Sequence, residues 1–288
     1  MRILKTASSA QKLALKLRLE NKIIGFVPTM GYLHEGHISL IKTARKKADV
    51  VFVSIFVNPI QFGPSEDFTR YPRNFKRDEK LCKDAGTDYI FYPSDKDMYP
   101  REYSTYIGME NITDILEGKI RPGHFKGVTT VCLKFFNIIC PHFALFGQKD
   151  AQQLAVIRKM VSDLNLPLKI IKGETVREHD GLAMSSRNVY LSNEQRKDAP
   201  ILFKALVYAK RKISEGYNRD IEFLTHQMYK LIKSRPAVTK IDYIAFNDNR
   251  TLKPIETLKN LKKNTELLIS LAVRFGKIRL IDNIVIKY

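Results

Sequence analysis

The chain has 288 residues and a mass of 33.2 kDa, which is enough for one large domain or two of ordinary size. No apolar run reaches the length of a membrane span, so we expect no membrane partner. The formal net charge of +19 suits either a nucleic-acid binder or an enzyme of anionic substrates. Lysines are interleaved with acids along the whole chain, which indicates either a solvated basic surface or a field that attracts anionic substrates at low salt.

The cysteine content and the N-terminus bear on the compartment. Cys82, Cys132 and Cys140 are an odd number, widely spaced and set in apolar or helical contexts, which is typical of a reducing environment. Residues 1–22 are basic and include two adjacent serines, as transit peptides do, but they lead into the first expected strand without a cleavage-like break. We therefore expect a cytoplasmic protein.

Apolar strands alternate with amphipathic helices up to about residue 173. The pattern predicts strands at 23–27, 50–57, 89–92, 143–146 and 168–171, and helices from residue 38 and over 74–85, 128–139 and 151–164. Continuous apolar strands that alternate with helices predict a parallel sheet covered on both faces. The fold class of this half is therefore α/β.

From about residue 174 the pattern changes. It predicts long helices over 193–215 and 220–234, then strands over 241–246, 267–273 and 279–287, with turns at 247–249 and 275–276. This order is typical of a smaller α+β domain with a largely antiparallel sheet. We expect two domains, residues 1–174 and 175–288.

The most informative segment is residues 28–37, Pro-Thr-Met-Gly-Tyr-Leu-His-Glu-Gly-His, which joins the first apolar strand to a helix. Its glycines permit close backbone approach, and a helix N-terminus offers unpaired N–H groups and a positive dipole end. Such a turn binds phosphate, and His34 and His37 can face one anion together. The alternatives are half of a zinc site, although no further His or Cys lies nearby in sequence, or two unrelated surface histidines.

Read as a whole, this segment resembles the His-x-Gly-His motif of the nucleotidylyltransferase superfamily, and its longer form resembles the pantothenate synthetase (pantoate–β-alanine ligase) family. Four further blocks are similar to that family in the same order: residues 54–63, 121–125, 146–153 and 184–188. The blocks at 28–37, 54–63 and 146–153 fall at the ends of expected strands. Ligands of parallel sheets bind beyond the carboxyl ends of the strands, which is an independent reason to group these blocks in one site.

The resemblance implies ATP-dependent joining of pantoate to β-alanine, through a pantoyl adenylate formed with release of pyrophosphate and then consumed with release of AMP. It further implies a Rossmann-like domain, residues 1–174, that binds nucleotide and pantoate, and a smaller lid domain, residues 175–288. Mg²⁺ is expected mainly on the ATP phosphates, with no protein metal ligand assigned. The implied assembly is a homodimer, and no nucleic-acid partner is expected.

The expected catalytic residues supply positive charge, because attack on the α-phosphorus builds negative charge on the phosphates. They are His34, His37, Lys149 and Arg187, and the resemblance implies that His37 is the proton donor. The expected ATP-binding residues are Met30, Gly31, Tyr32, Leu33, His34, Glu35, Gly36 and His37, then Gly147, Gln148, Lys149 and Asp150, then Val176, Met184, Ser185, Ser186 and Arg187.

Three neutral amides, Asn58, Gln61 and Gln153, are the expected ligands of pantoate and β-alanine. Amides can hold hydroxyls and a carboxylate without adding a competing nucleophile. The resemblance implies that Gln61 and Gln153 bind pantoate and that Gln61 also lies near β-alanine. The alternatives are an exposed helix position for Gln153 and a plain turn at Asn58.

Several other residues of these blocks have two interpretations. Asp150 could flank the ribose and phosphates or cap the helix that follows it. Arg121 could guard the site or position phosphate, whereas His124 is expected to be structural. Gln148 stands where many family members have glutamate, a change that should alter local charge more than mechanism.

Two other functions compete with this interpretation. Another adenylyl or cytidylyl transferase, acting on phosphopantetheine or nicotinamide mononucleotide, would lack the Asn-Pro-x-Gln-Phe block at 58–62. An RNA-binding module or synthetase fragment would suit the net charge, but the sequence lacks aromatic-rich RNA motifs and zinc-type cysteine pairs.

Overall fold

The computed structural model describes residues 1–64, 66–216, 220–259, 261–262 and 264–287. The chain forms two compact units, the first of residues 1–147 and 152–174 and the second of residues 148–151 and 175–288. Residues 148–151, which the sequence places in the first domain, make their contacts in the second unit. Asn283 Nδ2 donates there to the carbonyl oxygens of Gln148 and Lys149, at 3.0 and 2.9 Å.

The first unit contains a parallel sheet, as predicted, with six strands where the sequence pattern predicted five. Its strands are β1 (Arg2–Leu4), β2 (Ile24–Thr29), β3 (Val50–Ile55), β4 (Tyr89–Phe91), β5 (Phe143–Gly147) and β6 (Lys169–Gly173), in the spatial order β1-β4-β3-β2-β5-β6. Every neighbouring pair is parallel. All six residues of β3 are buried, which explains why its sequence is a continuous apolar run rather than an alternating one.

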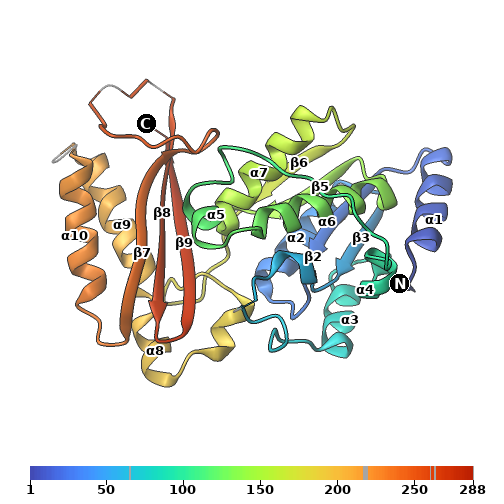
Figure 1. The fold of residues 1–288 in the computed structure, drawn as a ribbon, viewed down its shortest axis with the longest axis horizontal. Coiled ribbons are helices and arrows are strands. Elements are labelled where there is room, and N and C mark those ends of the chain that lie inside the picture. The colour runs from blue at the N-terminus through green and yellow to red at the C-terminus, as the bar shows by residue number, and fades with distance from the viewer. Residues whose placement is uncertain (65, 217–219, 260, 263, 288) are drawn as a thin grey trace. The chain divides into compact units, whose positions relative to one another are not determined.

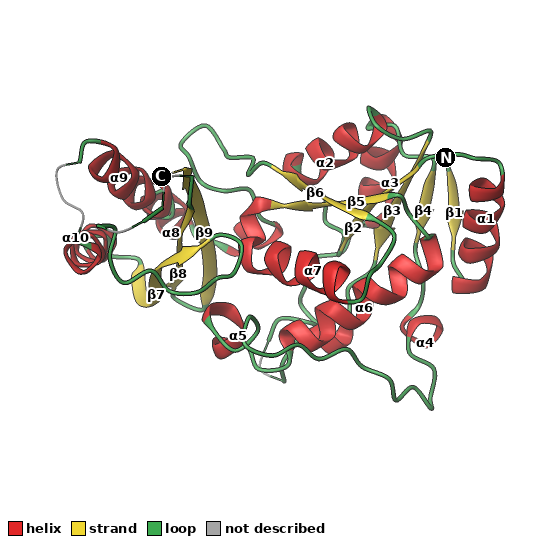
Figure 2. Cartoon of the chain, turned by 90° about the horizontal axis from the view of Figure 1, so that it is seen from above, coloured by secondary structure: helices red, strands yellow, loops and turns green. Residues whose placement is uncertain are grey.

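Helices cover both faces of this sheet (Figure 2). The helices of this unit are α1 (Ala7–Leu19), α2 (Glu35–Arg45), α3 (Phe75–Asp84), α4 (Asp95–Met98), α5 (Leu116–Ile120), α6 (His124–Ile139) and α7 (Ala151–Asp163). Figure 2 shows α2 and α3 on one face and α6 and α7 on the other. The apolar positions of α2, Ile38, Ile41 and Ala44, are buried in one core with Val27 of β2 and Val53 of β3. This packing fixes the carboxyl end of β2, where the histidine motif begins.

The N-terminal elements of the first unit were not predicted from the sequence. β1 adds an edge strand beside β4, and α1 packs against α6. Thr6 caps α1 by accepting a hydrogen bond from the Ser9 backbone N–H at 3.2 Å. The basic segment of residues 1–22 is therefore an integral part of the fold. No helix among the described residues is both long and apolar enough to cross a membrane.

The second unit packs helices against a three-stranded antiparallel sheet, also as predicted (Figure 1). Its elements are α8 (Asn193–Asp198), α9 (Ile201–Ser214), α10 (Ile221–Lys233), β7 (Val238–Asp248), β8 (Glu266–Phe275) and β9 (Ile278–Lys287). The prediction of one helix over 193–215 is wrong. Pro200 has no N–H to donate to the preceding turn, so α8 ends at Asp198 and α9 begins at Ile201.

Candidate active site

The topology of the first sheet places three of the motif blocks at the carboxyl ends of neighbouring strands. The chain runs outward from β2 through β3 to β4, then returns to β5 beside β2, so the strand order reverses between β2 and β5. Residues 30–37 follow β2, Asn58 and Gln61 follow β3, and Gly147 ends β5. The carboxyl ends of strands at such a reversal form the usual ligand crevice of doubly wound sheets.

The turn after β2 has an unusual backbone. Gly31 and Tyr32 have φ values of +82° and +49°, which are left-handed conformations that a tyrosine rarely adopts. Asp78 of α3, 1% exposed, stabilises this turn: its Oδ2 accepts from the Tyr32 N–H at 2.7 Å and its Oδ1 from the Leu33 N–H at 2.8 Å. Burial raises the pKa of the Asp78 carboxyl, although the two backbone donors oppose that shift. Asp78 was not predicted from the sequence as a residue of the site.

Replacing Asp78 with asparagine should therefore destabilise the first unit. A carboxamide turns one of the two acceptors into an NH₂ group that faces a backbone N–H, and an unsatisfied buried donor costs about 1–3 kcal/mol. The free energy of unfolding, measured by urea titration, should fall by that amount. Asp84→Asn, on the exposed side of the same helix, is the matched control, and equal stabilities of the two variants would contradict the assignment.

The two motif histidines form a capping box at the start of α2. His34 Nδ1 accepts from the Gly36 N–H at 3.1 Å, and His37 Nδ1 accepts from the His34 N–H at 3.3 Å. The ring centroids of His34 and His37 are 4.1 Å apart. Because Nδ1 accepts in both rings, each neutral imidazole carries its proton on Nε2. The helix cap thus makes Nε2–H the donor of both histidines.

Gly36 is required for this arrangement. A Cβ atom at that position would lie 2.8 Å from the His34 ring.

In the part of the chain that the structure describes, no group of three or more His, Cys, Asp or Glu side chains is arranged to hold a metal ion.

The second block holds Gln61 in a buried position. Asn58 is 1% exposed and Gln61 7%, and the two lie in and beside the short 3₁₀ helix Pro59–Gln61. Asn58 Nδ2 donates to Gln61 Oε1 at 3.0 Å and to the Gly127 carbonyl oxygen at 3.1 Å, while the Tyr99 hydroxyl donates to Asn58 Oδ1 at 2.8 Å. Both amide hydrogens of Asn58 are therefore engaged within the protein. Its side chain orients Gln61.

Two further residues support Gln61: Gly127, which was not predicted from the sequence, and Met30, which was expected to bind ATP. A Cβ atom on Gly127 would lie 2.5 Å from the Ile60 carbonyl oxygen, so only glycine lets α6 approach the 3₁₀ helix this closely. Met30 Sδ lies 3.0 Å from Gln61 Nε2.

The two glutamines at the start of α7 differ in environment. Gln153 is partly buried. Gln152 is 5% exposed, accepts from the Glu117 N–H at 2.8 Å, and donates to the carbonyl oxygens of Ile112 and Ile115 at 2.9 Å. Gln152 therefore anchors α5 and the segment before it.

Lys149 and its neighbours belong to the second unit. Lys149 Nζ lies 3.4 Å from Asp150 Oδ1, and the lysine side chain is 20% exposed. The Gln148 side chain is buried and donates to Asn283 Oδ1 at 3.1 Å. In this segment the charge of Lys149, and not the Gln148 amide, is partly exposed.

The fifth block forms a second turn in the same unit. The Met184 N–H donates to the Val176 carbonyl oxygen at 3.0 Å. Ser185 Oγ accepts from the Arg187 N–H at 3.3 Å and so caps the 3₁₀ helix Ser186–Tyr190. Ser186 is 7% exposed and Arg187 partly exposed. The local chain thus carries Arg187 on a capped and fixed turn.

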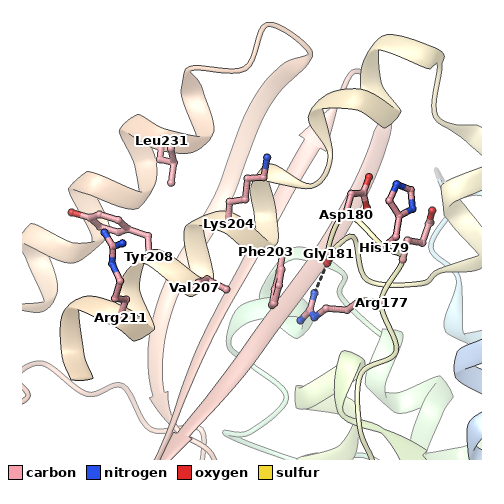
Figure 3. A pocket seen from close by; sticks show the side chains of 11 residues that line it. Arg177, His179, Asp180, Gly181, Phe203, Lys204, Val207, Tyr208, Arg211 and Leu231 are labelled. Atoms are coloured by element: carbon pink, nitrogen blue, oxygen red, sulfur yellow. Dashed lines mark hydrogen bonds between the residues drawn. The ribbon is translucent and has the colours of Figure 1, made fainter. Parts of the chain in front are cut away.

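A cavity of about 680 Å³ also lies in the second unit, between α9, α10 and the turn at 177–181 (Figure 3). The Arg177 guanidinium lies 3.9 Å from the Phe203 ring centroid and donates to the Gly181 carbonyl oxygen at 3.0 Å. Two further bonds, at 2.7 and 2.9 Å, join it to Asp282. None of the predicted substrate residues lines this cavity.

Comparison with known proteins identifies the family. Residues 2–285 match the family model described as pantoate-beta-alanine ligase. The chain belongs to the pantoate–β-alanine ligase family. The family expected from the five sequence blocks is thereby confirmed.

Relatives and solved structures agree over the full length. The chain is similar to a pantothenate synthetase of Caldicellulosiruptor bescii, with 52% identity over 287 residues, 100% of this chain and 99% of the relative. It is similar in structure to pantothenate synthetase of Thermus thermophilus, with a TM-score of 0.90, 41% identity and 99% of each chain covered. A pantoate-beta-alanine ligase of Francisella tularensis, described as complexed with beta-gamma ATP and beta-alanine, matches with a TM-score of 0.78 and 36% identity over 99% of this chain and 97% of that one.

Proposed function

We propose that this chain carries out the reaction of its family, the ATP-dependent joining of pantoate to β-alanine. Family membership over residues 2–285 supports the proposal, as do the names of relatives about 50% identical over the full chain. The observation that carries it is the histidine pair at the start of α2, with both Nε2–H donors set by the helix cap, in the same unit as the buried Gln61 carboxamide.

The first step forms the adenylate. A carboxylate oxygen of pantoate bonds to the α-phosphorus of ATP, and the bond from that phosphorus to the bridging oxygen of pyrophosphate breaks. His34 and His37, with the N-terminus of α2, offer hydrogen bonds to the phosphate oxygens on which charge develops. We assign Lys149 and Arg187 to the same task, with His37 as the proton donor.

The second step forms the amide. The β-alanine amine attacks the acyl carbon of the pantoyl adenylate, AMP leaves with the electrons of the acyl–phosphate bond, and the amine loses a proton to solvent. We assign Gln61, Gln153 and Asn58 to the binding of pantoate and β-alanine, with Gln61 and Gln153 on pantoate and Gln61 also near β-alanine. Asn58 in addition holds the Gln61 side chain. Buried amides suit this task because they bind hydroxyls and a carboxylate without reacting with the adenylate.

The nucleotide is assigned to the backbone and side chains of residues 30–37, Gly147 to Asp150, Val176 and Met184 to Arg187. We propose that Mg²⁺ enters bound to the ATP phosphates. The two-domain division at residue 174, with a catalytic first domain and a smaller second one, remains part of the same proposal.

Compartment and assembly are also proposals. Cys82, Cys132 and Cys140 are free thiols, and the first two are buried, which supports a reducing cytoplasm. The homodimer rests on the family resemblance alone. Light scattering coupled to size-exclusion chromatography, which gives the mass in solution, tests it.

The reaction itself is tested by product analysis with ATP, pantoate and β-alanine. AMP, pyrophosphate and the amide should appear in equal amounts, because activation occurs at the α-phosphorus. Label in the γ-phosphate should be recovered in pyrophosphate. In the absence of β-alanine, labelled pyrophosphate should exchange into ATP in a pantoate-dependent way. Recovery of the label as free phosphate, with no pyrophosphatase present, would exclude the assignment.

A further inference from the structure

An ion pair connects Glu66 to Arg121, which lies between α5 and α6. Arg121 Nε and Nη2 donate to Glu66 Oε1 and Oε2, both at 2.6 Å, and the two side chains are 17% and 21% exposed. This is the parallel two-bond geometry in which a guanidinium holds a carboxylate most specifically. Burial works against ionisation of Glu66, but the Arg121 guanidinium outweighs it and holds the pKa of that carboxyl below its ordinary value.

The remaining Arg121 nitrogen fixes the state of His124. Arg121 Nη1 lies 3.1 Å from His124 Nε2, and His124 Nδ1 lies 2.9 Å from the Gln61 carbonyl oxygen. A guanidinium can only donate, so His124 Nε2 accepts, and the ring proton is on Nδ1 and is donated to Gln61. Burial first, and then the neighbouring Arg121 charge, lower the pKa of His124 to about 4, so the ring is neutral at pH 7.

Gln61 is thus held at two points. Its backbone carbonyl accepts from His124, and its side-chain oxygen accepts from Asn58, which the Tyr99 hydroxyl holds in turn. The 3₁₀ helix that contains Gln61 has only three residues and few internal hydrogen bonds with which to fix its own orientation. External contacts must therefore determine where the carboxamide points.

We propose that His124, held in its Nδ1–H tautomer by Arg121, is a positioning residue that aims the Gln61 carboxamide at pantoate. The inference rests on the proposed function, because it takes Gln61 as the pantoate ligand. It assigns Arg121 to Glu66 and His124 rather than to phosphate, and it gives the structural role expected for His124 a specific target.

Three substitutions of His124 test the tautomer. The amide nitrogen of asparagine lies close to the position of Nδ1, whereas that of glutamine reaches toward the position of Nε2. His124→Asn should keep the KM for pantoate within about threefold of the wild type, while His124→Gln and His124→Ala should raise it by about tenfold, the effect of one net hydrogen bond. The KM for ATP should change by less than about twofold in all three, since nucleotide contacts come from other residues. His226→Gln, at an exposed position on α10, is the control.

A spectroscopic measurement separates this inference from the proposed function. In protein labelled with ¹⁵N-glutamine, the side-chain amide signals of Gln61 should shift in His124→Gln and stay near the wild-type positions in His124→Asn. This readout does not depend on catalysis. Equal shifts in the two variants would overturn the tautomer assignment. A parallel rise in the KM for pantoate and the KM for ATP would show that His124 acts only on general stability. Absence of AMP and pyrophosphate with the unaltered protein would overturn the proposed function while leaving the spectra to decide the positioning role.

Discussion

Replacing His37 with alanine is expected to slow adenylate formation by about 10²–10³, as loss of one preorganised donor to developing charge commonly does. The helix cap uses His37 Nδ1 as an acceptor. The hydrogen-bond donor that the alanine substitution removes from the reaction is therefore the Nε2–H group. His37→Gln, whose amide nitrogen reaches toward the Nε2 position, should retain more activity than His37→Asn. That order is the reverse of the one expected at His124, where Nδ1 donates.

Single-turnover measurements with excess enzyme isolate this step. The rate of adenylate appearance should fall in His37→Ala and by a similar factor in Lys149→Ala, while His226→Ala, at an exposed position, should match the wild type. Circular dichroism and the free energy of unfolding show whether each variant is folded. A rate within a few-fold of the wild type in a folded variant would remove that residue from the catalytic set.

The layers of the fold could be predicted because burial determines the sequence pattern. β3 is apolar at almost every position since both of its faces are covered, and this run cannot be confused with a half-exposed strand. The helix break at Pro200 was missed because the apolar period of 3.6 residues continues from one helix to the next. A single absent N–H breaks the helix without changing that period.

The N-terminal helix could not be predicted from its leucines. Leu13, Leu15, Leu17 and Leu19 alternate as in a strand, yet Leu15 and Leu19 are 49% and 86% exposed on α1. The buried face instead consists of Ala10, Ala14 and Leu17, which follow the helical spacing but include two small residues. The pattern was therefore present but weaker than the misleading alternation.

Some residues of the candidate site could be predicted from the sequence and others could not. The residues within the motifs could be assigned from the sequence, because a strand end, a turn and a helix start constrain neighbouring positions. The residues that hold the motif residues in place could not be assigned in this way. Asp78 is 46 residues from Tyr32, and Tyr99 is 41 residues from Asn58, so only the folded chain brings these partners together. An aspartate in a charged helix or a tyrosine in a loop carries no local signal of such a contact.

Gln61 is the residue whose substitution should separate the two substrates. Gln61→Ala should weaken pantoate binding by about 5–150-fold, because a polar substrate group left unpaired in a buried site costs about 1–3 kcal/mol. ATP affinity should stay nearly unchanged, since the residues assigned to the nucleotide lie in other blocks. Gln11→Ala, at an exposed position on α1, is the control for loss of a glutamine side chain.

Gln61→Glu should bind pantoate more weakly than the alanine variant. A glutamate can still accept from Asn58 Nδ2, so the support of the side chain is retained, but the amide donor is replaced by a negative charge. That charge would repel the pantoate carboxylate in a pocket where Gln61 is only 7% exposed and water screens little. Calorimetric titration of each variant with ATP and with pantoate measures the two affinities separately. If ATP binding collapses while pantoate binding survives, Gln61 belongs to the nucleotide site and the assignment of substrates to the two blocks must be exchanged.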